Sequence, residues 1–424
     1  MRIEPASSVQ GGVSVPGDKS ISHRALLFGA VADGDTVVEG FGRSADTEST
    51  LGAVRALGAE VGEGGDTVRI TGAGLRGLRS AVVDCGNAGT LARLLPGLLA
   101  GQDGQRFELT GDESLSGRPM DRVADPLATM GVAVETTDGR LPLTIEGGPV
   151  QAIRYELPVA SAQVKSCVLL AGLFGDGPTT VVEPVPTRDH TERMLRAAGA
   201  RVDTRPGEVT VHPVERLAPL RVTVPGDFSS AAPFLVAATL LPGSRLRVAG
   251  VSVNPTRTGL LDVLERMGAR ISLYNRTVTG GEPVADIEVE HADLVATAVE
   301  PAEVPRLIDE LPLFALAASL ARGESSVRGA AELRAKETDR IDAVTNALRT
   351  MEIRIRDTDD GFRVRGVPTR PKGGGVDSRG DHRIAILGAV AGLVSREGVT
   401  IRDPEVVSVS FPGFYQQLES VSQR

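Results

Sequence analysis

The sequence predicts an α/β protein in which one unit of helices and strands occurs six times. The first observation is an apolar helix that ends in a small turn and leads into a short Val-rich strand, of which the chain contains six copies. The second is an amphipathic helix that runs through a Gly turn into another strand, of which there are five copies. Helices and strands repeated in this mixed order are typical of an α/β fold with internal pseudo-symmetry.

Each unit is expected to contain a helix, a strand, a loop, a second helix and a strand hairpin, over about 70 residues. The apolar helices begin in the strings GDKSISHR, GNAGTLAR, ASAQVKS, GDFSSAA, IDELP and GDHRIA. The amphipathic helices end in VRALGAEV, LATMGVAV, MLRAAGARV, LERMGARI and the more divergent LRTMEIRI. Gly58, Gly131, Gly199 and Gly268 occupy the turn in the first four copies, and Glu352 takes their place in the fifth.

Two similar strings mark where the chain is expected to pass between domains. SVPGDKS, near residues 14–20, and TVPGDFSS, at 223–230, both run from a strand into Pro-Gly-Asp and a Ser-rich helix start. This pattern is typical of a turn followed by a helix N-cap. The sequence therefore predicts a continuous domain of three units over residues 17–225 and a discontinuous domain of three units formed by residues 1–16 and 226–424.

Composition excludes several classes of protein. The 424 residues include 46 basic and 55 acidic side chains, giving a formal net charge of −9, and aromatic residues make up 3% with no Trp. This composition offers neither a basic surface nor an aromatic stacking platform for nucleic acid. No signal-peptide pattern, apolar run near 18 residues or metal-ligand spacing occurs, and two cysteines cannot form a disulfide framework. We expect a cytoplasmic protein without a metal or a membrane partner.

The helix starts carry residues suited to binding anions. A helix N-terminus presents unpaired N–H groups and the positive end of the helix dipole. Lys19 and Arg24 add positive charge around Ser20 in GDKSISHR, whereas GDFSSAA has no nearby cation and is explained by capping alone. Equivalent helix starts of pseudo-symmetric domains are expected to face each other across a cleft that holds small polyanions.

Further candidates stand beside these helix starts. Three arginines next to a Gly, a Pro or a helix start are expected to bind anions: Arg118, Arg340 and Arg383. KETDRIDAV is interpreted as a helix that places Lys336 and Arg340 on one face, four residues apart. Glu337 in a cationic pocket could donate or accept a proton. Asp309 lies at the edge of an apolar helix, where a carboxylate is costly unless it caps the helix or takes part in chemistry.

Taken in order, these strings resemble the 3-phosphoshikimate 1-carboxyvinyltransferase family, also called EPSP synthases. The match runs from PGDKSISHRA through GNAGT, GRPMDR, SAQVKS, KETDR and GDHRIA to SFPGFY. GDKS, SAQVK, RDHTE and NPTR resemble the class II subgroup, which is associated with tolerance of the inhibitor glyphosate. The resemblance implies the enolpyruvyl transferase fold, with two pseudo-symmetric domains of three βαβαββ units each and the active site in the interdomain cleft.

The resemblance also implies a reaction. The enolpyruvyl group of phosphoenolpyruvate moves to the 5-hydroxyl of shikimate 3-phosphate, and phosphate is released by addition and elimination through a tetrahedral intermediate, in aromatic amino acid biosynthesis. No metal and no organic cofactor take part. The partners implied are these two small molecules, and we expect a monomer that binds neither nucleic acid nor a membrane.

Roles follow residue by residue from the matched strings. The residues implied to bind shikimate 3-phosphate are Lys19, Ser20, Arg24, Ser161, Ala162, Gln163 and Arg188. Those implied to bind phosphoenolpyruvate are Asn87, Gly89, Thr90, Arg118, Arg340 and Arg383, together with Lys19. The implied catalytic residues are Asp309, Glu337 and Lys19. Asp309 is implied to take the proton of the 5-hydroxyl, Lys336 to orient that hydroxyl, and Glu337 to protonate the methylene carbon of phosphoenolpyruvate.

Three positions depart from family patterns. Val409 precedes SFP where many members have Lys, so no phosphoenolpyruvate contact is assigned there, and Glu332 stands where some members have Asn. Gly89 occupies the position at which strongly glyphosate-tolerant members carry Ala, so we expect intermediate or high sensitivity.

Two alternatives are weighed against this interpretation. UDP-N-acetylglucosamine enolpyruvyl transferase shares the fold and the donor but typically has a reactive Cys on a loop, and the corresponding TGDESLSGRPMD contains none. Cys85 and Cys167 are expected to be small buried residues. A non-catalytic anion-binding protein on this scaffold would need the cations but not an acid–base pair such as Asp309 and Glu337.

Overall fold

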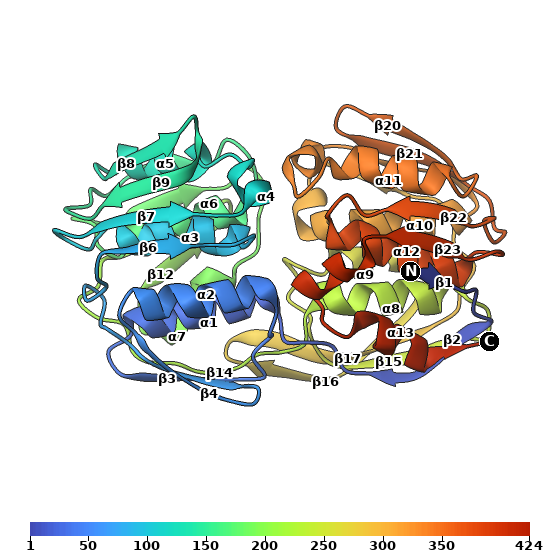
Figure 1. The fold of residues 1–424 in the computed structure, drawn as a ribbon, viewed down its shortest axis with the longest axis horizontal. Coiled ribbons are helices and arrows are strands. Elements are labelled where there is room, and N and C mark those ends of the chain that lie inside the picture. The colour runs from blue at the N-terminus through green and yellow to red at the C-terminus, as the bar shows by residue number, and fades with distance from the viewer. The chain divides into compact units, whose positions relative to one another are not determined.

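The computed structural model describes residues 1–424, which form two compact units (Figure 1). Unit 1 comprises Met1–Pro16, Pro225–Thr277 and Pro283–Arg424, and unit 2 comprises Gly17–Val224 and Val278–Glu282. The chain passes between the units within SVPGDKS and TVPGDFSS, and again at the tip of a hairpin. This tip, Val278–Glu282, belongs to unit 2, in which the buried Glu282 carboxylate lies 2.7 Å from Nδ1 of the buried His190.

Unit 2 contains three four-stranded sheets of the same design, ordered β14-β3-β5-β4, β6-β7-β9-β8 and β10-β11-β13-β12. The strands are β3 (Asp35–Glu39), β4 (Glu60–Gly64), β5 (Thr67–Thr71), β6 (Ala81–Asp84), β7 (Arg106–Thr110), β8 (Ala133–Thr137), β9 (Arg140–Glu146), β10 (Arg154–Glu156), β11 (Thr179–Val182), β12 (Val202–Arg205), β13 (Glu208–Val211) and β14 (Arg221–Thr223). In each sheet the first two strands are parallel and the remaining pairs are antiparallel. A parallel pair requires a crossover, usually a helix, and a helix connects β6 to β7 and β10 to β11, so these two sheets with their helices are βαβαββ units. In the first sheet, the strand parallel to β3 is β14, which comes last in the sequence of the unit.

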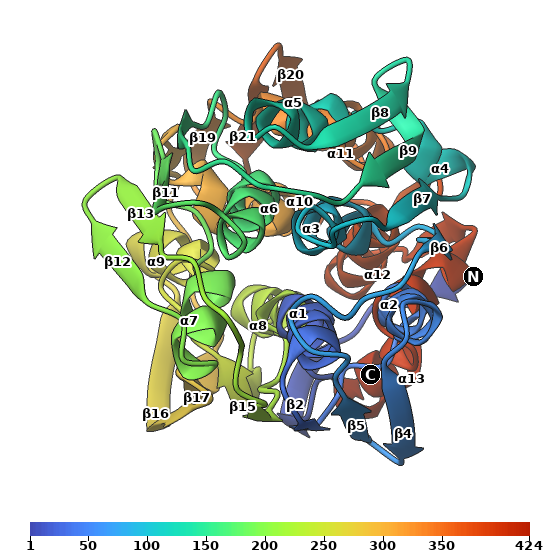
Figure 2. The same cartoon turned by 90° about the vertical axis from the view of Figure 1, so that its left-hand side faces the viewer.

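The helices of unit 2 divide into a buried group and a more exposed group. They are α1 (Lys19–Val31), α2 (Ala45–Ala56), α3 (Gly89–Leu99), α4 (Glu113–Ser116), α5 (Asp121–Thr129), α6 (Ala162–Gly172) and α7 (His190–Ala197). The apolar helices α1, α3 and α6 are buried along most of their length, and Figure 2 shows them at the centre of the unit with the sheets outside them. A helix that is apolar all round is stable only in such surroundings.

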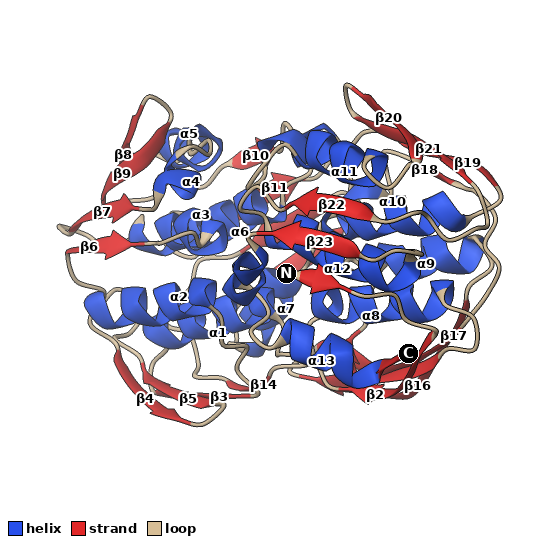
Figure 3. Cartoon of the chain, turned by 45° about the vertical axis from the view of Figure 1, so that its right-hand side comes forward, coloured by secondary structure: helices blue, strands red, loops and turns tan.

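Unit 1 also contains three sheets, but they have five, four and three strands, ordered β16-β17-β15-β2-β24, β18-β19-β21-β20 and β1-β23-β22. The strands are β1 (Arg2–Ile3), β2 (Ser8–Val13), β15 (Arg245–Ser252), β16 (Arg270–Thr279), β17 (Glu282–Glu290), β18 (Ala298–Val299), β19 (Gly323–Val327), β20 (Arg354–Thr358), β21 (Gly361–Gly366), β22 (Gly374–Asp377), β23 (Val399–Arg402) and β24 (Ser422–Gln423). The α-helices are α8 (Phe228–Leu240), α9 (Gly259–Arg266), α10 (Leu311–Leu320), α11 (Arg340–Arg349), α12 (His382–Val394) and α13 (Phe414–Val421), and short 3₁₀ helices span Val304–Arg306, Ile308–Glu310, Ala331–Ala335 and Pro404–Val409. Figure 3 shows β22 and β23 along α12.

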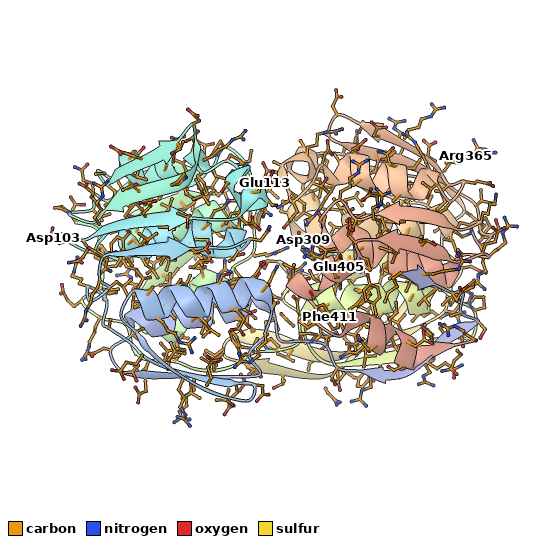
Figure 4. All side chains as sticks on the ribbon, viewed as in Figure 1. Asp103, Glu113, Asp309, Arg365, Glu405 and Phe411 are labelled. Atoms are coloured by element: carbon orange, nitrogen blue, oxygen red, sulfur yellow. The ribbon has the colours of Figure 1, made fainter.

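Both chain ends complete sheets of unit 1. β1 pairs antiparallel with β23, and β2 pairs parallel with β15 and antiparallel with β24. The sixth unit lacks the Gly-turn phrase and uses α13 as its second helix. Its start is held by an aromatic cluster of Phe234, Phe411 (labelled in Figure 4) and Phe414, whose ring centroids lie 5.4–6.2 Å apart.

The predicted turns between helix and strand are confirmed. Gly58, Gly131, Gly199 and Gly268 have φ values of 103°, 82°, 86° and 100°, and Glu352 at the equivalent place has φ 64°. The left-handed backbone at this helix end is therefore also present in the copy that has Glu352 in place of glycine. No helix combines the length and the apolar character needed to cross a membrane.

Candidate active site

Six buried helices begin at the strings that the sequence predicts, and four have a side-chain cap. Asp18, Ser161, Asp227 and Asp381 each accept a hydrogen bond from a backbone N–H in the first turn of α1, α6, α8 and α12. α3 and α10 have no such cap. Capping fixes where each helix starts, so the side chains of the next residues are held at defined places.

In unit 2 the first turns of α1 place two cations in different surroundings. Nζ of the half-buried Lys19 lies 2.8 Å from the carboxylate of Asp46. Arg24 is buried and donates to Thr191 Oγ1 at 2.7 Å, Ser166 Oγ at 3.0 Å and the carbonyl of Ser20 at 3.0 Å. Burial lowers the pKa of Arg24 to about 10, against the attraction of nearby carboxylates, so Arg24 is still a cation at neutral pH.

The helix starts of α3 and α6 meet through side chains. Gln163 donates from Nε2 to Thr90 Oγ1 at 3.2 Å and accepts at Oε1 from Arg93 at 2.9 Å. This contact joins the predicted residues Gln163 and Thr90, and it adds Arg93, which the prediction does not include. The sequence feature that could identify Arg93 as a site residue is its position one helical turn after Gly89 in the string GNAGTLAR.

A second contact joins Asn87 and Arg118. Oδ1 of Asn87 accepts from Arg118 Nη2 at 2.7 Å, and Nδ2 donates to Asp112 at 2.7 Å. A Cβ on Gly89 would lie 3.1 Å from Arg118 Nη1 and 3.2 Å from Arg93 Nη1. The helix start thus lets two guanidinium groups approach its backbone because the residue there is glycine.

Arg188 follows a turn that is fixed by buried charges. Lys165, one helical turn after Ser161, lies 3.0 Å from Glu183 and 2.7 Å from Glu192. The carboxylate of Glu183 also accepts from the backbone N–H of Thr187 at 2.9 Å. This arrangement anchors both sides of Arg188, and the sequence prediction assigns no role to Glu183 or Glu192.

In unit 1 the guanidinium of Arg340 holds three carboxylates. It donates to Asp381 at 2.7 Å, to Glu337 at 2.5 Å and to Asp309 at 3.3 Å. Asp309, labelled in Figure 4, lies in the short 3₁₀ helix that leads into α10. Burial opposes the charge of Arg340, but the three carboxylates outweigh it and raise the pKa of this group. The structure therefore brings Asp309 and Glu337 to one cation.

The predicted helix KETDRIDAV is wrong at its start. Lys336 has an extended backbone, with φ −88° and ψ −160°, and α11 begins at Arg340. Asp339 caps the helix by accepting from the N–H of Asp342 at 3.0 Å. Lys336 and Arg340 are consequently not on one helical face, while Glu337 reaches Arg340 from the preceding loop.

The interpretation of GDFSSAA as a cap without cations is also wrong. Asp227 does cap α8, but the hydroxyl of Ser229 accepts hydrogen bonds from Arg257 and from Arg383, the latter at 3.1 Å. It donates to Glu310 at 2.6 Å. The available signals were Arg257 in the class II-like string NPTR and Glu310 directly after Asp309.

The two cysteines are buried as predicted. Burial raises the pKa of Cys85 and of Cys167 to about 12, so neither thiol ionises at neutral pH. No group of three or more His, Cys, Asp and Glu side chains is arranged to hold a metal ion.

Two units of three sheets packed on buried helices, with cations at the helix starts and three carboxylates on Arg340, define the class of enolpyruvyl transferases. The family model described as EPSP synthase (3-phosphoshikimate 1-carboxyvinyltransferase) matches residues 3–418. The chain belongs to the EPSP synthase family.

Individual relatives match over the whole chain. The 3-phosphoshikimate 1-carboxyvinyltransferase of Citrifermentans bemidjiense is 51% identical over 426 residues, covering 100% of this chain and 99% of the relative. That of Desulforudis audaxviator is 50% identical, covering 99% of both chains. A solved structure of EPSP synthase from Acinetobacter baumannii is 42% identical, with a TM-score of 0.88 and coverage of 99% of this chain and 98% of that chain.

Proposed function

We propose that the residues gathered in the two units carry out the reaction of the family. As a member of that family, the protein is a transferase that moves the enolpyruvyl group of phosphoenolpyruvate to shikimate 3-phosphate and releases phosphate. One observation carries the assignment of catalytic residues: Asp309 and Glu337 both contact the guanidinium of Arg340, at 3.3 and 2.5 Å. A pure anion-binding protein has no need of two carboxylates on its anion-binding cation.

The proposed chemistry uses these carboxylates in opposite directions. Glu337 gives a proton to the methylene carbon of phosphoenolpyruvate. The oxygen of the 5-hydroxyl bonds to the phosphoenolpyruvate carbon next to that methylene, and Asp309 accepts the proton that the hydroxyl loses. Lys336 orients that hydroxyl. Loss of phosphate and of a proton from the new methyl group then restores the double bond. Arg340 and Arg383 stabilise the carboxylate and phosphate charges throughout.

The residues of unit 2 are proposed to hold the anionic groups. For shikimate 3-phosphate they are Lys19, Ser20, Arg24, Ser161, Ala162, Gln163 and Arg188. For phosphoenolpyruvate they are Asn87, Gly89, Thr90 and Arg118, with Lys19 reaching both. Charge-assisted hydrogen bonds from Arg and Lys to phosphate are the strong kind, and the network of Gln163, Thr90 and Arg93 supports this assignment by fixing two helix starts together.

The proposed domains are residues 1–16 with 226–424 and residues 17–225, and each is proposed to contribute residues to the reaction. We further propose that the enzyme acts as a monomer in the cytoplasm, independently of nucleic acid and membranes. The free, buried thiols of Cys85 and Cys167 support a reducing compartment.

The test is phosphate release from a mixture of shikimate 3-phosphate and phosphoenolpyruvate by three variants. Asp309→Asn and Glu337→Gln keep the shape of each side chain but remove its proton-transfer capacity, so turnover should fall at least about 100-fold. Asp262→Asn, at an exposed carboxylate of the same unit, should retain turnover. Wild-type turnover in either site variant would remove that residue from its role.

A further inference from the structure

We propose that Arg257 and Glu310 are positioning residues for Arg383, and through it for the phosphoenolpyruvate end of the site. The proposal rests on the role of Arg383 in the proposed function. It extends the site by a buried ion pair to which the sequence assigned no role.

The ion pair is buried and bidentate. Arg257 donates from Nη1 to Glu310 Oε2 at 2.7 Å and from Nη2 to Glu310 Oε1 at 3.1 Å. The side chain of Arg257 is 3% exposed and that of Glu310 is 0% exposed. Two parallel hydrogen bonds fix the orientation of both planar groups, which a lysine at position 257 would not achieve.

Arg257 is itself held by its loop. Oδ1 of Asn254 accepts from the N–H of Thr256 at 3.0 Å and from its hydroxyl at 2.8 Å. The carbonyl of Asn254 accepts from the N–H of Arg257 at 2.8 Å. The loop between β15 and α9 is thus closed into a turn, and it presents the guanidinium from a fixed backbone.

Ser229 connects the ion pair of Arg257 and Glu310 to Arg383 through hydrogen bonds. A hydroxyl can donate one hydrogen bond and accept two. Ser229 donates to Glu310 and accepts from both Arg257 and Arg383, so its capacity is fully used. Arg257 and Glu310 therefore determine where the acceptor for Arg383 Nη2 lies.

Glu310 also acts directly on Arg383. Its Oε1 lies 3.5 Å from Arg383 Nη1, and that same nitrogen donates to the carbonyl of Asp309 at 3.1 Å. Arg257 supplies the closer positive charge, which satisfies the Glu310 carboxylate. Without Arg257, this buried carboxylate would have Arg383 as its nearest cation, and an uncompensated buried charge is costly enough to draw the guanidinium to it. Arg383 would then be lost to an anionic ligand.

The variant that tests this is Arg257→Met, which keeps an unbranched apolar chain and removes the charge. We expect the KM for phosphoenolpyruvate to rise about tenfold, while the KM for shikimate 3-phosphate changes less than about twofold. Arg257→Lys retains the positive charge but cannot form the two parallel hydrogen bonds to Glu310, so the KM for phosphoenolpyruvate should rise about threefold. In the double variant Arg257→Met with Glu310→Gln, no buried carboxylate competes for Arg383, and this KM should return to within about threefold of the wild-type value.

A matched control is Arg266→Met. Arg266 in α9 also lies 2.7 Å from a glutamate, Glu303, but these side chains are 41% and 26% exposed, and both KM values should stay unchanged. Should Arg257→Met fail to fold, Arg257→Lys and the double variant decide the question.

Each remaining outcome contradicts the proposal. Unchanged KM values in folded Arg257→Met, or an equal rise for both substrates, would reduce the pair to a structural role. A double variant as impaired as Arg257→Met would exclude competition by Glu310. If instead the wild-type protein released no phosphate from the two substrates, the proposed function itself would fail, and the same assay shows this before any variant is compared.

Discussion

Nδ1 of His23 lies 2.7 Å from the hydroxyl of Thr50, and both side chains are buried. This contact joins α1 to α2 one residue before Arg24. Burial lowers the pKa of His23 to about 3, with Asp46 opposing the shift and Lys19 and Arg24 adding to it. The helix start that carries the proposed substrate cations therefore contains a neutral imidazole over the physiological pH range.

His23 makes stability depend on pH. The unfolded chain binds a proton at His23 below about pH 6.5, whereas the folded protein does so only near pH 3. Stability is thus fully present above pH 6.5 and falls as the pH drops toward 3, by about 2 kcal/mol at pH 5 for this residue. Urea unfolding at pH 8 and pH 5 should show a smaller loss for His23→Gln than for the wild type. Equal losses would contradict the buried neutral state.

Gly89→Ala should weaken phosphoenolpyruvate binding selectively. A Cβ would lie 3.1 Å from Arg118 Nη1 and 3.2 Å from Arg93 Nη1, so both guanidinium groups must move. A cost of about 1 kcal/mol corresponds to a rise of about fivefold in the KM for phosphoenolpyruvate, and inhibition by glyphosate should weaken with it. Gly52→Ala is the control, because a Cβ at that helical glycine meets no atom within 4 Å. An unaltered KM in Gly89→Ala would argue against the assignment of Arg118.

Glu352→Gly should stabilise the protein. Glu352 has φ 64°, a left-handed conformation that costs a non-glycine residue about 1 kcal/mol. Its ion pair with Lys372 is exposed and contributes little. Glycine adds about 0.5 kcal/mol of entropy to the unfolded chain, so the free energy of unfolding in urea should rise by about 0.5 kcal/mol. Gly199→Ala tests the same turn in reverse, since φ is 86° with no atom near the new Cβ, and it should destabilise by a similar amount.

Alkylation should leave the native enzyme active. Both thiols are buried, with pKa values raised to about 12, so iodoacetamide at pH 7.5 finds no thiolate. Mass spectrometry should show no adduct on the native protein and two on the unfolded chain. Inactivation that parallels modification of a single cysteine would instead indicate the reactive cysteine of the rival transferase.

The parts of the site that could be predicted from sequence are those encoded locally. A capping residue, the first helical turn and a basic residue lie within a few positions of each other, as in the string that contains Asp18, Lys19 and Arg24. The same strings also mark six helices and, through their order, the repeated unit. These features can be predicted from the sequence because a helix cap or a turn is formed by residues that are neighbours in the chain.

What the sequence could not reveal depends on distant partners. Ser229 meets Glu310 across 81 positions of the chain and Arg257 across 28, so no string contains the group. The helix predicted over KETDR begins too early for a different reason. The spacing of Lys336 and Arg340 favours one helical turn, but Asp339 caps α11 and excludes the preceding residues from the helix. A Thr-Asp pair before a periodic segment was the local signal for that boundary.

In the proposed reaction this protein joins shikimate 3-phosphate to phosphoenolpyruvate and releases one phosphate for each pair of molecules joined. The most direct measurement is ³¹P NMR of the purified protein with shikimate 3-phosphate and phosphoenolpyruvate, alongside a second sample in which UDP-N-acetylglucosamine replaces shikimate 3-phosphate. We expect the two substrate signals of the first sample to be replaced one for one by inorganic phosphate and a new phosphate monoester, and the second sample to stay unchanged. No reaction in the first sample, or phosphate release in the second, would contradict the proposal that this protein transfers the enolpyruvyl group specifically to shikimate 3-phosphate.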